Sequence, residues 1–142
     1  MILKFRAWDK EEKKMHKVKT IEFSRRGARI IHLAEVQSNG KGDHKRWHSS
    51  VELMQSTGLK DKNGVEIYEG DIVELKYPYD KRIKTIGIIV WDIYKSCFGI
   101  SMKETTERYE LYRITAENYL SVIGNVFEDE ILLSDLERGS DE

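Results

Sequence analysis

Acidic side chains come nearest, in this sequence, to the spacing of a catalytic or metal-binding set. Four carboxylates lie within nine residues: Glu66, Glu69, Asp71 and Glu74. Carboxylates grouped in this way hold divalent ions in metal-dependent nucleases. Turn chemistry, however, accounts for Glu69 and Asp71, and the outward face of a strand accounts for Glu74. The sequence therefore predicts a protein that is not an enzyme, with a metal-dependent hydrolase as the alternative that these residues leave open.

Two further patterns could bind metal ions, and both are incomplete. His44 and His48 are four residues apart with Asp43 adjacent, a spacing that would let the two imidazoles share an ion on a helix. Their surroundings indicate loop and strand instead, and no third ligand is evident. Residues 61–64 (Asp-Lys-Asn-Gly) resemble the start of a calcium loop but lack its acidic repeat and its closing Glu. We expect no metal and no cofactor.

Cys97 is the one cysteine of the chain and lies in an apolar segment. A nucleophilic thiol would need a neighbouring base, so a buried structural thiol is the default expectation. A lone cysteine makes no internal disulfide, which favours a reducing cytoplasm. The sequence has neither the apolar core of a signal peptide nor an apolar run long enough to span a bilayer, so we expect a cytoplasmic protein without a membrane partner.

Basic residues around one tryptophan suggest a nucleic-acid-binding surface. The residues that would form it are Arg25, Arg26, Arg29, Lys41, Lys45, Arg46 and Trp47. The three arginines at 25–29 cluster at one expected turn, and the indole of Trp47 could stack on a base. The alternative is that lysines and arginines keep the edges of a β-sheet soluble while Trp47 packs in the core.

Charge is distributed unevenly along the chain although the net charge is only −1. Residues 1–62 hold 15 Lys and Arg against 8 Asp and Glu, a net charge of +7, and residues 63–142 hold 9 against 17, a net charge of −8. Three explanations fit this polarity: two halves that attract each other within the fold, complementary surfaces on neighbouring subunits, or a basic patch for nucleic acid.

Alternating and apolar segments predict that the fold is mainly β. The expected strands cover residues 3–8, 20–23, 30–36, 51–55, 72–77, 83–92, 97–102, 109–114 and 119–126. Short strands at this spacing favour a barrel or roll over a βαβ fold. We predict an SH3-like small barrel over residues 47–142, preceded by an additional N-terminal β lobe over residues 1–46. The Gly-rich segment 37–45 is the expected boundary, and one continuous domain is the alternative.

Particular residues set the expected turns. Asn63-Gly64 predicts a tight turn, and Gly70-Asp71 predicts a sharp bend into a strand, where the Asp carboxylate can accept backbone N–H groups. Gly87 inside a strand predicts a bulge or bend. Only the tail has a helical pattern: Asp129 could cap a short C-terminal helix that ends near Gly139.

Three blocks of the sequence resemble the YopX family of phage and prophage proteins. The first is Phe5-Arg6-Ala7-Trp8-Asp9 followed by Met15, the second runs from Leu53 to Ile72, and the third is Val122-Ile123-Gly124-Asn125-Val126-Phe127-Glu128. The resemblance implies an SH3-like barrel, a phage or prophage origin, and a cytoplasmic location in an infected or lysogenic bacterium. It implies no activity, because the family is uncharacterised.

These observations together lead to one expectation about function and one alternative. We expect a non-enzymatic phage accessory protein that acts through protein contacts, as a homo-oligomer or with another host or phage protein as its partner. The alternative is a nucleic-acid-binding module that uses the basic N-terminal residues.

Overall fold

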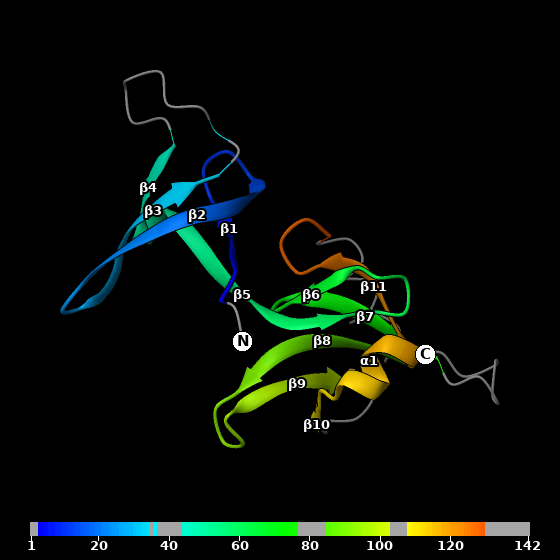
Figure 1. The fold of residues 1–142 in the computed structure, drawn as a ribbon. Coiled ribbons are helices and arrows are strands. Elements are labelled where there is room, and N and C mark those ends of the chain that lie inside the picture. The colour runs from blue at the N-terminus through cyan, green and yellow to red at the C-terminus, as the bar shows by residue number, and fades with distance from the viewer. Residues whose placement is uncertain (1–2, 35, 37–43, 77–84, 103–107, 130–142) are drawn as a thin grey trace, which may run out of the picture. The chain divides into compact units, whose positions relative to one another are not determined.

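The structure is a computed structural model that describes residues 3–34, 36, 44–76, 85–102 and 108–129 (Figure 1). Its strands are β1 (Phe5–Asp9), β2 (Lys14–Ser24), β3 (Gly27–Leu33), β4 (Lys45–Trp47), β5 (Val51–Lys60), β6 (Glu66–Tyr68), β7 (Asp71–Leu75), β8 (Thr85–Asp92), β9 (Cys97–Met102), β10 (Arg108–Glu110) and β11 (Leu120–Asn125). A 3-10 turn, η1 (His48–Ser50), and one short helix, α1 (Arg113–Tyr119), complete the described elements. The prediction of a mainly β fold is confirmed.

The chain divides into two compact units, which we call the N-terminal unit (Ile2–Gln55) and the C-terminal unit (Ser56–Glu142). The division falls inside β5, whereas the sequence led us to expect a boundary after Arg46. The difference has a simple cause in strand pairing. β4 pairs with β3, and the first half of β5 pairs with β1, so both segments add strands to the N-terminal sheet.

Antiparallel pairing in the order β4-β3-β2-β1-β5 builds the N-terminal unit. Its core consists of Ala7, Ile31, Leu33 and Val51, which come from three of these strands. Ala7 and Asp9 are buried on the same side of β1 because side chains two residues apart share a face. Strand alternation therefore carries a carboxylate, Asp9, onto the apolar side of the sheet.

A five-stranded antiparallel sheet in the order β10-β9-β8-β7-β11 forms most of the C-terminal unit, and β6 pairs with the second half of β5. Ile67, Val73, Ile89, Ile100 and Leu120 are buried in its core. The pairings among described residues leave β10 and β11 as the two ends of this sheet and do not close it into a barrel. The SH3-like barrel thus stays a prediction.

Helix α1 lies where the sequence predicted part of a strand. Strand β10 ends at Glu110, and the chain becomes helical from Arg113, so the expected strand over residues 109–114 is wrong in its second half. Ile114 and Thr115 are β-branched, which favours a strand, but Ala116 is fully buried in the core. Tertiary packing therefore decides the conformation of this short segment. The expected C-terminal helix lies almost entirely outside the described residues. Among the described residues, no helix is long and apolar enough to cross a membrane.

Gly87 sits in a continuous part of β8, so the predicted bulge there is wrong. It pairs with Val73 on β7 and with Met102 on β9 without a shift of register. The reason for a glycine is close packing, since a Cβ atom at this position would lie 2.5 Å from Cγ2 of Ile100. Register shifts occur elsewhere among the described strands, in the pairings of β2 with β3, of β5 with β6 and of β7 with β11.

This packing predicts that Gly87→Ala destabilises the C-terminal unit by about 1–3 kcal/mol, the usual cost of overpacking a core. Hydrogen exchange of the β8 and β9 amides would measure it. Ser101→Ala, which only removes an atom from the neighbouring strand, is the matched control and should change exchange little. Equal exchange rates in Gly87→Ala and the wild type would contradict the packing argument.

Candidate functional site

The buried carboxylate of Asp9, at the end of β1, joins several polar groups of the N-terminal unit. Its Oδ2 atom accepts a hydrogen bond of 2.7 Å from Nε of Arg46 on β4. Its Oδ1 atom accepts backbone N–H groups of Glu11 (3.0 Å) and Glu12 (3.2 Å) in the β1–β2 turn. Nη2 of Arg46 also lies 3.3 Å from Oε1 of Glu12. One carboxylate thus fixes a turn and anchors the strand at the end of the sheet.

Competing effects act on the ionisation of Asp9. Burial by itself would raise the pKa of this carboxyl. The hydrogen bond and charge of Arg46, together with the two backbone N–H groups, oppose burial and hold the pKa below its ordinary value. Asp9 and Arg46 therefore form a charged pair in the folded protein at neutral pH.

Strand pairing brings His16 to this pair. His16 lies opposite Ala7 in the β1–β2 ladder and therefore shares the buried side of the hairpin with Asp9. Nε2 of His16 is 3.9 Å from Oε2 of Glu12. Among the described residues, Asp9, Glu12 and His16 form the group whose ligand atoms could hold a metal ion. Sequence reasoning missed this group because its only signal is the alternation of β1 continued across a hairpin.

The basic residues singled out from the sequence do not gather at one place. Arg25 and Arg26 are exposed at the β2–β3 turn, Lys45 is exposed on β4, and Arg46 is engaged by Asp9 and Glu12. Lys41 lies outside the described residues.

Arg29 and Trp47 do come together. The guanidinium of Arg29 lies 5.4 Å from the centre of the Trp47 ring, and its Nη1 atom is 3.2 Å from Nε2 of His48. Arg29 is the extra residue of a bulge, because Glu22 pairs with Ile30 and the next β2 residue, Phe23, pairs with Ala28. Bulges redirect side chains. Trp47 is 50% exposed, so the expectation that it packs in the core is wrong.

Two carboxylates in and beside the acidic stretch that first suggested catalysis, Asp71 and Asp61, hold the backbone. Oδ2 of Asp71 accepts the N–H of Tyr68 at 2.7 Å, which confirms the expected role of this carboxylate at the start of a strand. Asp61 accepts the N–H groups of Asn63 and Val65 through Oδ1 and that of Val122 through Oδ2. Asp61 therefore holds its own turn and ties that turn to β11. Cys97 is half-buried, so the expectation of a buried thiol is wrong.

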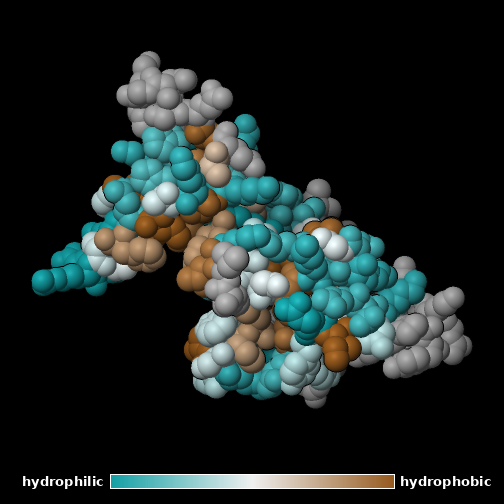
Figure 2. Space-filling view, in the orientation of Figure 1, coloured by the Kyte–Doolittle hydropathy of each residue, from teal (hydrophilic) through white to brown (hydrophobic). Residues whose placement is uncertain are grey.

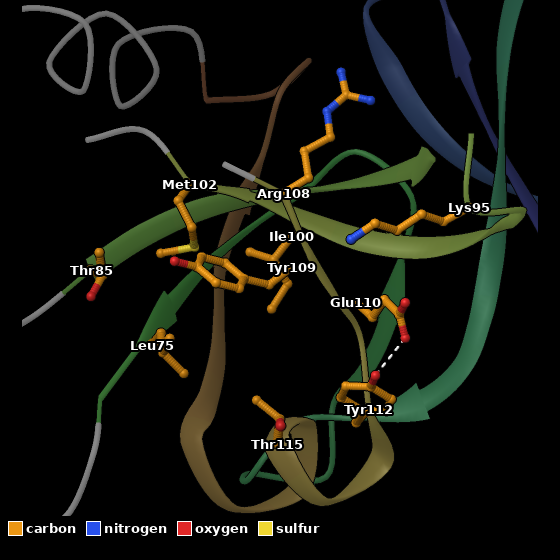
Figure 3. A pocket seen from close by; sticks show the side chains of 10 residues that line it. All are labelled: Leu75, Thr85, Lys95, Ile100, Met102, Arg108, Tyr109, Glu110, Tyr112 and Thr115. Atoms are coloured by element: carbon orange, nitrogen blue, oxygen red, sulfur yellow. Dashed lines mark hydrogen bonds between the residues drawn. The ribbon is translucent and has the colours of Figure 1, made fainter. Parts of the chain in front are cut away.

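A cavity of about 550 Å³ opens in the C-terminal unit (Figure 3). Its lining residues are Leu75, Thr85, Lys95, Ile100, Met102, Arg108, Tyr109, Glu110, Tyr112 and Thr115. The hydroxyl of Tyr112 donates to the Glu110 carboxylate, and this hydrogen bond raises the pKa of Tyr112. Aliphatic, aromatic and charged groups therefore meet in one hollow beside β10.

Large apolar side chains stand exposed near this cavity. Ile93 (68% exposed) and Tyr94 (88%) lie in the β8–β9 turn, next to the lining residue Lys95. Ile114 (72%) lies at the start of α1, next to the lining residue Thr115. Figure 2 shows brown patches, which mark residues of high hydropathy, on the surface of the protein. Sequence reasoning missed them because it could not tell outward from inward residues in turns.

The fold thus defines a mainly β protein of two units. The charged and aromatic groups described above, which are the Asp9 cluster, the Arg29–Trp47 pair and the residues beside the cavity, lie at hairpin turns and at the ends of sheets. Residues 4–134 match the family model described as YopX protein, and the chain belongs to the YopX family. The chain is similar to the crystal structure of protein EF1440 from Enterococcus faecalis, with 30% identity and a TM-score of 0.68. That similarity covers 94% of this chain and 99% of the other. No curated protein matches the sequence.

The lowered pKa of Asp9 predicts a specific acid sensitivity. Because the folded-state pKa is depressed, the stabilisation is complete above the ordinary Asp pKa of about 4 and is lost as the pH falls through the folded value. Asp9→Asn should cost about 2 kcal/mol or more at neutral pH, since it leaves Arg46 half-buried without its carboxylate.

Urea denaturation of wild type and Asp9→Asn between about pH 3 and 7 would measure this difference. The stability gap between the two should shrink toward low pH. Glu11→Gln, a neutral change at the exposed neighbouring residue, is the control and should give no such trend. A gap that stays constant over the whole range would show that Asp9 does not contribute as a charged group.

Proposed function

We propose that the protein is a non-enzymatic accessory protein of a phage or prophage that acts through protein contacts, as a homo-oligomer in the host cytoplasm. The phage setting is what the family resemblance implies. The observation that carries the proposal is the exposure of large apolar side chains around one cavity of the C-terminal unit: Ile93, Tyr94, Tyr109, Tyr112 and Ile114.

Exposed apolar groups are common singly on protein surfaces, but a group of them marks interaction sites. Tyrosine is enriched in protein interfaces because its ring buries much area at low entropy cost and its hydroxyl still finds a partner. Three of these five side chains are tyrosines. They come from the β8–β9 turn and from the segment around β10, the end strand of the sheet. End strands are where further chains pair.

Charge indicates which partner suits this surface. The C-terminal unit has 11 Lys and Arg against 18 Asp and Glu, a net charge of −7, and the N-terminal unit has 13 against 7, a net charge of +6. An acidic unit attracts a basic partner, and the chain itself supplies one in the N-terminal unit of a second copy. We therefore propose a second copy of this chain as the partner.

The double variant Tyr94→Ser/Ile114→Ser should weaken self-association by about tenfold or more, since buried interface side chains contribute about 1 kcal/mol each. Light scattering over a concentration series at low and high salt would measure it. The wild type should exceed the monomer mass, more so at low salt. Val65→Ser is the matched control, because the side chain of Val65 is also exposed (47%). Asp61 holds the turn that contains Val65 and also binds β11, so this turn lies at the opposite end of the sheet from β10. A monomeric wild type at both salt concentrations would disprove self-association.

A nucleic-acid-binding module is the second candidate, and the pairing of Arg29 with Trp47 favours it. A half-exposed indole beside a guanidinium offers a stacking surface and a positive charge to a nucleobase and its phosphate. Both belong to the basic N-terminal unit. Arg25, Arg26 and Lys45 would add attraction for phosphates, whereas Arg46 is committed to Asp9.

For this second candidate, Trp47→Ala should weaken binding to single-stranded DNA or RNA by about 1–3 kcal/mol, the usual contribution of one stacked base. Arg25→Ala/Arg26→Ala should reduce the salt dependence of the binding constant. Gel shifts and fluorescence titrations would measure both effects. Arg113→Ala removes an exposed arginine from the acidic unit and should leave binding unchanged. No shift at low salt with either nucleic acid would rule this function out.

A further inference from the structure

Three side chains of the β1–β2 hairpin lie close together, those of Asp9 and His16 buried and that of Glu12 half-exposed, and none of them belongs to the surfaces proposed above. Asp9 ends β1, Glu12 lies in the turn, and His16 returns on β2 opposite Ala7. One ligand atom from each lies within 4.8 Å of the other two. The hairpin therefore gathers two carboxylates and an imidazole from only eight residues of sequence.

His16 provides an independent reason to expect a ligand there. The residue is only 8% exposed, and neither ring nitrogen has a hydrogen-bond partner among the described residues. An imidazole always carries at least one N–H, so a buried donor and a buried acceptor are left unpaired in the neutral ring. Unpaired buried groups of this kind are rare, and a bound water or ion is a usual explanation.

The spacing suits an ion better than a direct bond. Nε2 of His16 is 3.9 Å from Oε2 of Glu12, which is too long for a hydrogen bond. Zinc bonds to histidine nitrogen and to carboxylate oxygen are each about 2.0–2.2 Å long, so one ion could reach both atoms. The conformation of the turn already favours this arrangement, because Oδ1 of Asp9 holds the N–H of Glu12.

We propose that Asp9, Glu12 and His16 bind a divalent transition-metal ion of the zinc class. One nitrogen and two carboxylate oxygens are ligands that zinc accepts, whereas magnesium and calcium prefer oxygen alone. Three protein ligands leave a fourth position for water. Nδ1 of His16 then carries the ring proton, since a metal-bound nitrogen is not protonated.

The guanidinium of Arg46 already contacts the two carboxylates that such an ion would bind. It contacts Oδ2 of Asp9 and Oε1 of Glu12, and it leaves Oε2 of Glu12 facing His16. The two carboxylates and Arg46 together carry a charge of −1, so a dication is attracted to the group but less strongly than without the arginine. Arg46 thus sets the affinity without being a ligand.

Titration of the metal-free, full-length protein with zinc chloride by calorimetry, and with cobalt chloride by absorption spectroscopy, tests the proposal. We expect one ion per chain, and a cobalt spectrum that reports ligand geometry without any assay of activity. His16→Gln should weaken binding more than about tenfold, since even loss of an outer-shell partner typically costs that much. Arg46→Gln should tighten binding.

His32→Gln is the matched control, because Nε2 of His32 lies 2.9 Å from Glu22 in the same sheet but outside the group. It should bind zinc as the wild type does. Should His16→Gln fail to fold, Glu12→Gln, a change at a half-exposed side chain, replaces it with the same expected loss. Absence of one-to-one binding in the wild type, or wild-type affinity in the folded His16 or Glu12 variant, overturns the proposal and leaves a bound water as the partner of His16.

Discussion

Buried acidic and amide side chains at the ends of strands are the interaction on which most of this fold depends. Each accepts backbone N–H groups of the turn beside it: Asp9, Asp61, Asp71, Asp92 and Asn125. All five are at most 7% exposed. Hydrogen bonds to charged groups contribute about 1.5–3 kcal/mol each, so together these acceptors define where strands stop and turns begin.

This use of carboxylates gives a structural role to Asp71, in the acidic sequence stretch, and to the nearby Asp61. Asp61 accepts backbone N–H groups through both of its oxygens, and Asp71 accepts one through Oδ2. What the fold leaves available lies at its turns and sheet ends: the exposed apolar groups beside the C-terminal cavity and the Arg29–Trp47 pair. Both suit contact with a binding partner.

Asp9 differs from Asp61 because its second oxygen pairs with a charged side chain rather than with backbone. The pairing removes Arg46 from the basic surface and places it beside Glu12 and, through Glu12, near His16. A residue that looked like a phosphate contact is thus part of a buried charge cluster. At the bulge, by contrast, the guanidinium of Arg29 lies over the half-exposed ring of Trp47.

The sequence by itself determined the mainly β class, the turn at Asn63-Gly64 and the role of Asp71, because alternation and turn chemistry are local properties. It also determined the family, through the three blocks of sequence that resemble it. It also determined the charge polarity, which persists when counted over the two observed units. Only the tertiary structure decided the helix at Arg113–Tyr119, where burial of Ala116 outweighs β-branched neighbours, and the need for glycine at position 87. Likewise, the meeting of Asp9 with Arg46 and His16 depends on strand register and on pairing between segments far apart in the chain. Such contacts are set by which strands lie side by side, and no local pattern encodes that choice.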